Sequence, residues 1–131
     1  MVFDPKKWTT KTSEAIAAAM ESASINNNPE LTADHVMAAL CRQTDTIVPA
    51  LLSKLGIAAT MLRDRADEVV TKLPRAQGGN EPRMNRELTN IFANAETLRV
   101  DMKDDYLSVE HLLVAMNQRV GIGSEEMLQA L

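Results

Sequence analysis

Residues 31–40 read Leu-Thr-Ala-Asp-His-Val-Met-Ala-Ala-Leu, and residues 107–116 read Leu-Ser-Val-Glu-His-Leu-Leu-Val-Ala-Met. The two stretches match position for position at an offset of 76 residues, and the offset holds without a gap over about forty positions. This period exceeds the ~34–47 residues of helical solenoid units, so each copy is expected to be a small multi-helix unit. We therefore predict two tandem repeats that pack as a pseudo-twofold pair.

A segment rich in helix breakers separates the two copies. Repeat one is predicted over about residues 10–73, a linker with two prolines and two glycines over 74–85, and repeat two over about 86–131. Repeat two stops at Leu131, before any counterpart of the helical pattern at 58–73. We expect repeat two to be incomplete, so that residues 1–131 form the N-terminal domain of a longer chain.

The composition favours helices over strands. Hydrophobic residues make up 45% of the chain but aromatic residues only 3%, whereas strands are enriched in β-branched and aromatic side chains. Ala15, Ile16 and Ala19 begin an apolar stripe of helical spacing, which Thr10 or Thr12 is placed to cap. The sequence predicts an all-α fold with about four helices in each repeat, the second truncated at its C-terminal end.

The charge and hydropathy of the chain argue against two classes of partner, nucleic acids and membranes. The net charge of -4 is dispersed, which argues against a nucleic-acid partner. No stretch approaches the ~18 apolar residues of a membrane span, and the chain starts at Met1 without the pattern of a signal peptide. A single cysteine, Cys41, suits a reducing compartment. We expect a cytoplasmic domain that is monomeric when isolated.

Few residues point to catalysis or to a cofactor. The sequence lacks the Gly-x-x-x-x-Gly-Lys-Ser/Thr motif that cradles phosphates, so this segment is not expected to be an enzyme or to bind a cofactor. His35 and His111 are either metal ligands or packed, capping residues, and their matching positions near a helix start favour the second interpretation. Cys41 lies on an apolar helical face and is interpreted as a small core residue rather than a nucleophile.

The repeated histidine elements resemble a known family. Leu31-Thr32-Ala33-Asp34-His35 and Leu107-Ser108-Val109-Glu110-His111, each after an Ala-rich helix and a polar turn, are similar to the double N-terminal repeat of Clp-type AAA+ chaperones. The linker and residues 104–111 look most like those of ClpB disaggregases, especially actinobacterial forms. The resemblance covers essentially the whole chain.

The resemblance implies a domain that engages exposed hydrophobic segments of misfolded or aggregated proteins. It would pass them to AAA+ modules of the parent chain, which would form a hexameric ring and use ATP and magnesium. One alternative is the adaptor-docking N-domain of a protease unfoldase of the ClpA or ClpC type. Another is a small helical enzyme or metal-binding bundle. The sequence argues against it, because it lacks the spaced residues that would bind a metal ion or form a catalytic site.

The resemblance also implies a set of substrate-binding residues. These are Thr9, Leu98, Asp104, Glu110 and His111, with Leu98 in a groove along the helices of repeat two. The polar residues have structural alternatives, because Thr9 can extend an N-cap, Asp104 can serve the turn and Glu110 can face the helix dipole. The eight methionines fit either core filling or an adaptable groove for unfolded chains.

Overall fold

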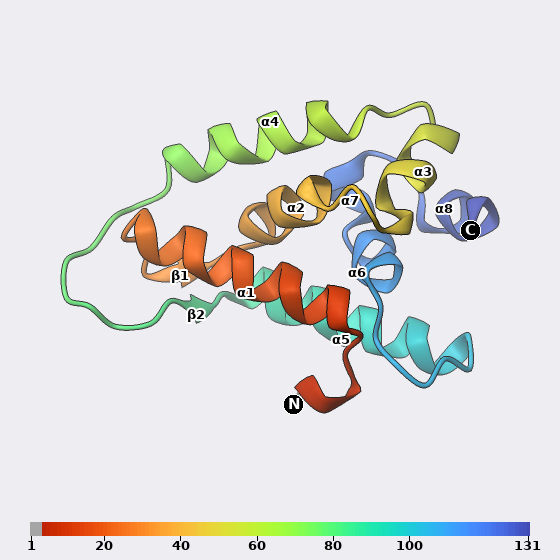
Figure 1. Cartoon of the computed structure of the whole chain (residues 1–131), viewed down its shortest axis with the longest axis horizontal. Helices are drawn as coiled ribbons and strands as arrows, with labels where there is room; N and C mark the ends of the chain where they lie inside the picture. The colour runs from red at the N-terminus through yellow and green to blue at the C-terminus, as the bar shows by residue number, and fades with distance from the viewer. Residues whose placement is uncertain (1–3) are drawn as a thin grey trace.

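The computed structural model describes residues 4–131, and these residues fold into eight α-helices (Figure 1). The all-α prediction is confirmed, with one short 3-10 turn at Pro5–Lys7 and two two-residue strands, β1 (Glu30–Leu31) and β2 (Arg83–Met84). The helices are α1 (Thr10–Ile25), α2 (Ala33–Arg42), α3 (Ile47–Lys54), α4 (Ala59–Thr71), α5 (Arg86–Asp101), α6 (Val109–Ala115), α7 (Asn117–Val120) and α8 (Ser124–Ala130).

Backbone conformation repeats between the two halves. Asn27 and Lys103 lie 76 positions apart, and both have left-handed φ angles, of 55° and 60°. Among the described residues they are the two non-glycine residues with positive φ. Each ends the turn after a long helix, α1 in one half and α5 in the other. The matched turns let α2 and α6 begin in the same way.

The segment before each long helix pairs with the opposite half. Leu31 of β1 pairs with Met84 of β2, and Trp8 forms an isolated parallel bridge with Leu107. Asn85 N donates to Leu31 O across 3.0 Å, and Thr9 N donates to Leu107 O across 3.0 Å. Because corresponding residues of the two bridges differ by 76 positions, a pseudo-twofold relation connects them.

The core lies around α2 and α6. Residues 33–41 of α2 are all buried, as are Val109 and residues 111–114 of α6. Figure 1 shows α4 running along one side of α2, and α1 also packs on α2. Thr12 of α1 is fully buried, and its hydroxyl donates to Leu107 O across 2.9 Å, which joins the two halves.

The halves differ in how many helices they carry. Helices α5, α6 with α7, and α8 correspond to α1, α2 and α3 at the 76-residue offset. Between residues 4 and 131, no helix packs on α6 as α4 packs on α2. Leu131 is 38% exposed and Leu128 is half-buried at this end of the domain. The residue limits assigned to the repeats and the linker remain predictions from the sequence.

The connection from α4 to β2 starts as an ordered segment. Ala76 N donates to Asn27 O across 2.8 Å, and the Asn28 amide donates to Pro74 O across 3.1 Å. Gly78 and Gly79 then carry the chain away from the helices as an open loop, visible at the left of Figure 1. The positive φ of 70° at Gly79 is a conformation that glycine adopts without strain.

Candidate functional site

Thr9 serves as the N-cap of α1. Its hydroxyl oxygen accepts a hydrogen bond from Thr12 N across 3.2 Å, which corrects the expectation that Thr10 or Thr12 would cap this helix. The Thr9 hydroxyl also lies 2.8 Å from the Thr12 hydroxyl, which itself donates to the other half. In the second half Asn85 caps α5 in the same way, through Leu88 N at 2.9 Å. The hydroxyl of Thr9 is therefore already hydrogen-bonded within the fold.

His35 and His111 close the capping boxes of α2 and α6. The Nδ1 atom of His35 accepts from Thr32 N across 3.0 Å, and that of His111 accepts from Ser108 N across 2.9 Å. Each ring is 1% exposed. Because Nδ1 accepts a backbone N–H, the neutral ring carries its proton on Nε2. Glutamate or glutamine normally completes such a box, so histidine in this role is a variation on the motif.

The opposite ring atom of each histidine reaches the preceding turn. His35 Nε2 donates to Asn28 Oδ1 across 2.9 Å, and His111 Nε2 donates to Asp104 Oδ2 across 2.8 Å. Asn28 and Asp104 are themselves 76 positions apart. Burial lowers the pKa of His35, because the charged ring would lose water without gaining a partner on Nδ1. One oxygen of Asp104 thus supports the start of α6.

Glu110 differs from Thr9 and Asp104, because its carboxylate has no hydrogen bond or ion pair with any described residue. It lies in the first turn of α6, where the helix dipole favours negative charge. The side chain is half-buried. Of the three polar residues predicted for the site, Glu110 alone keeps its whole carboxylate free for a ligand.

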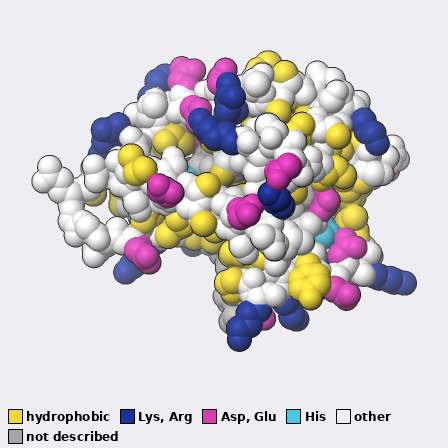
Figure 2. Space-filling model, viewed as in Figure 1, with side chains coloured by type: hydrophobic (Ala, Val, Ile, Leu, Met, Phe, Trp, Pro, Cys, Tyr) yellow, Lys and Arg dark blue, Asp and Glu magenta, His cyan; other side chains and the backbone are white. Residues whose placement is uncertain are grey.

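Asp104 and Glu110 line one surface depression between α3, α6 and the turn after α5. We call it the acidic depression; its carboxylates come from Asp104, Asp105 and Glu110, and its apolar side chains from Ile47, Met102, Tyr106 and Leu131. All four apolar residues are among the large hydrophobic residues that stay exposed, with Tyr106 56% exposed. In Figure 2, acidic and hydrophobic side chains lie beside one another toward the right of the view. The depression therefore offers apolar area next to negative charge.

Most of the apolar side of this depression could not be predicted from the sequence. Tyr106 and Met102 belong to the turn after α5, and Ile47 comes from α3 in the other half, so no single periodic stripe contains them. An exposed tyrosine within a polar turn was the one available signal. Leu98, which we predicted in a groove of repeat two, does not line the depression. It is half-buried and packs against the core.

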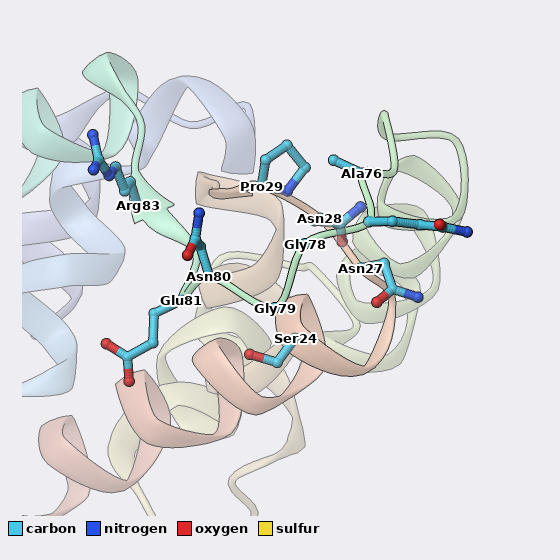
Figure 3. A pocket seen from close by; sticks show the side chains of 11 residues that line it. Ser24, Asn27, Asn28, Pro29, Ala76, Gly78, Gly79, Asn80, Glu81 and Arg83 are labelled. Atoms are coloured by element: carbon cyan, nitrogen blue, oxygen red, sulfur yellow. The ribbon is translucent and has the colours of Figure 1, made fainter.

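Two other surface hollows are weaker candidates for a binding site. One lies under the linker loop (Figure 3), where Ser24, Asn27 and the backbone of Gly78 and Gly79 surround the space. The charged side chains at its rim, Glu81 and Arg83, point in different directions (Figure 3). Another lies between α1 and α4, and the Arg42–Asp67 ion pair, at 2.6 Å, borders it. Neither hollow brings several unpaired charges of the same sign together.

Cys41 and the acidic residues give no sign of metal or thiol chemistry. Cys41 is 7% exposed, and burial raises the pKa of its thiol to about 11, which keeps it protonated at neutral pH. Within residues 4–131 no three His, Cys, Asp or Glu side chains are grouped as they would be around a metal ion. None of the helices described is long and apolar enough to cross a membrane.

Comparisons with known proteins agree with this architecture. Residues 7–131 match the Clp repeat (R) N-terminal domain family. The chain is 37% identical over 116 residues to the chaperone protein ClpB of Corynebacterium diphtheriae; this covers 87% of the chain and 13% of that relative. The chain thus spans only a small part of the curated relatives that it matches.

Solved structures show the same fold at lower identity. The Hsp104 N-terminal domain from Candida albicans superposes with a TM-score of 0.78 at 17% identity, covering 95% of this chain and 88% of that one. A ClpV N-domain in complex with a VipB peptide superposes with a TM-score of 0.71 at 17% identity, covering 92% and 79%. The resemblance to ClpB expected from the repeated histidine elements is confirmed: the chain belongs to the Clp repeat N-terminal domain family.

Proposed function

We propose that this chain is the substrate-binding N-terminal domain of a ClpB-type ATP-dependent disaggregase and that it works in the cytoplasm. Its substrates would be exposed hydrophobic segments of misfolded or aggregated proteins. The observation that carries the proposal is the cluster of exposed apolar side chains, Ile47, Met102 and Tyr106, in the acidic depression. Partial burial of such side chains gives weak, sequence-tolerant binding, because ordering an unfolded segment offsets much of the gain.

The remainder of the parent protein also belongs to the proposal. The curated relatives are about eight times longer than the matched region, since that region covers 13% of their length. ATP hydrolysis, magnesium and a hexameric ring would reside in those further modules. The domain would collect substrates and present them to the ring, which needs an affinity low enough for release.

An adaptor-docking role, as in unfoldases of the ClpA or ClpC type, is the second candidate. It is favoured by the likeness to a ClpV N-domain in complex with the peptide of a named partner. In that case one defined partner would bind the domain tightly, and unrelated unfolded chains would not. Comparing several unrelated unfolded proteins therefore separates the two functions.

The proposal is tested by fluorescence anisotropy with a labelled, permanently unfolded protein such as reduced, carboxymethylated lactalbumin. The chain should bind it saturably, with a dissociation constant in or above the micromolar range. Tyr106→Ser should weaken binding by about fivefold, because it removes an aromatic ring from the contact. The matched control is Ile25→Ser, since Ile25 is 74% exposed but lies outside the acidic depression. Equal losses in both variants, or none in Tyr106→Ser, would refute this surface.

A further inference from the structure

The turn after α5, residues 102–108, carries Tyr106 between two anchored ends; we call it the tyrosine turn. At its first end Asp104 N donates to Arg99 O across 3.0 Å, and the Arg99 guanidinium donates to Asp104 O across 2.8 Å. At its last end Leu107 is 1% exposed. Within the described part of the chain, Asp105 and Tyr106 make no hydrogen bond. The position of the Tyr106 ring therefore depends on how firmly its neighbours are held.

A strap of residues 7–9 holds the last end of the tyrosine turn. Leu107 N donates to Lys7 O across 2.7 Å, and Leu107 O accepts from Thr9 N across 3.0 Å. Residues 4–7 are exposed, whereas Trp8 is half-buried and packs against the core. Trp8 is thus the first side chain of the described chain that can fasten the strap.

The Trp8 ring rests on a fixed support. It lies against the ring of Phe92 in α5, with ring centroids 5.5 Å apart and ring planes tilted by 34°. Phe92 itself is 1% exposed. Aromatic pairs of this kind stabilise a structure beyond the area that they bury. The contact joins the strap to the helix that leads into the tyrosine turn.

The corresponding turn of the other half is held differently. Met84 stands at the position of Trp8 at the 76-residue offset, and it pairs with Leu31. The linker also covers that turn, because Ala76 N donates to Asn27 O across 2.8 Å. Within residues 4–131, the strap alone gives the tyrosine turn backbone hydrogen bonds from a segment other than α5 and α6. The tyrosine turn therefore depends more on its strap than its counterpart depends on β2.

We propose that Trp8 is a positioning residue of the acidic depression, although it does not line the depression itself. Its contact with Phe92 keeps the strap on Leu107, and the strap holds the tyrosine turn in the conformation that presents Tyr106 to an unfolded segment. Such preordering strengthens binding, because a ligand that must also order its site loses part of the binding free energy. The inference rests on the proposed function.

The test compares two residues that are equivalent in the internal repeat. Binding of labelled, carboxymethylated lactalbumin is followed by anisotropy in Trp8→Ala and in Met84→Ala. Trp8→Ala should weaken binding by about fivefold, as expected for Tyr106→Ser, whereas Met84→Ala should stay within about twofold of wild type. Trp8→Phe keeps an aromatic ring against Phe92, so it should restore binding to within about twofold of wild type.

A double variant separates positioning from a general loss of stability. If Trp8 acts through Tyr106, adding Trp8→Ala to Tyr106→Ser should cause no further loss of binding, because the effects of coupled residues do not add. Hydrogen exchange gives an independent measurement. The amide proton of Leu107, which donates to Lys7 O, should exchange about tenfold faster in Trp8→Ala, and that of Asn85, which donates to Leu31 O, should not.

Trp8→Met covers the case in which Trp8→Ala does not fold, because methionine is the residue type that the other half has at this position. It lacks the ring and should weaken binding by about threefold. A folded Trp8→Ala or Trp8→Met variant that binds as tightly as wild type would overturn the inference. Equal losses in Trp8→Ala and Met84→Ala would overturn it too, as would losses that simply add in the double variant.

The same measurements distinguish this inference from the proposed function. If wild type does not bind the unfolded protein, the proposed function itself fails. If wild type binds and Tyr106→Ser weakens binding while Trp8→Ala does not, the positioning role of Trp8 fails and the proposed function stands.

Discussion

His111 Nε2 donates to Asp104 Oδ2 across 2.8 Å, in the geometry with which His35 Nε2 donates to Asn28 Oδ1. The other half of the molecule thus shows that an amide oxygen can take the place of this carboxylate. Asp104 therefore supports the fold as well as lining the acidic depression. Replacing it by asparagine, the residue type at the matching position 28, separates these two roles.

Asp104→Ala should lower the free energy of unfolding by about 1–2 kcal/mol, because the buried His111 ring loses its acceptor. Asp104→Asn should stay within about 0.5 kcal/mol of wild type, since the amide oxygen can still accept. Urea denaturation gives both values, with Asp105→Ala as the control for loss of a neighbouring exposed carboxylate without a partner. Equal destabilisation by Asp104→Ala and Asp105→Ala would contradict the structural task.

The pH dependence of stability should contain a contribution from His35. Its pKa in the folded state lies below the ordinary value of 6.5, so the unfolded chain binds the proton more readily. The contribution is complete above about pH 6.5 and is lost as the pH falls toward the lowered pKa of the folded state. His35→Gln keeps a capping-box side chain without a titrating ring. Between pH 7.5 and 5.5 wild type should therefore lose more unfolding free energy than His35→Gln, and parallel losses would show that the ring does not contribute.

Arg119→Ala should destabilise the fold by about 2 kcal/mol, because the nearly buried Asp34 carboxylate would lose its cation. Chemical denaturation measures the change. Arg65→Ala removes an exposed arginine for which no ion pair is seen, and should change stability by less than about 0.5 kcal/mol. An Arg119→Ala variant as stable as Arg65→Ala would mean that the ion pair between Asp34 and Arg119 adds nothing to the stability of the fold.

Much of the fold could be predicted from the sequence, because helical periodicity and the 76-residue offset are both visible without any knowledge of tertiary contacts. The caps at Thr32 and Ser108 follow from the residue types alone, and both are observed. The first cap was misplaced by one residue or more, because several threonines precede α1 and only the tertiary contact with Leu107 selects Thr9.

The candidate site was less predictable. Asp104 and Glu110 were identified through family resemblance, yet their different states depend on partners distant in sequence. The sequence around Glu110 does not indicate that its counterpart Asp34 is paired with Arg119, which lies 85 residues after Asp34. The contribution of Ile47 to the acidic depression likewise arises from the packing of α3 on α6.

The most direct test of the central claim is a nuclear magnetic resonance titration of the isotopically labelled 131-residue chain with the unfolded lactalbumin probe. We predict that the largest chemical-shift changes will fall on Ile47, Met102, Tyr106 and Glu110, around the acidic depression. Residues of the hollow between α1 and α4, such as Ile25 and Val70, should change little. Shifts concentrated on that hollow or on the linker loop, with the acidic depression unaffected, would contradict the account.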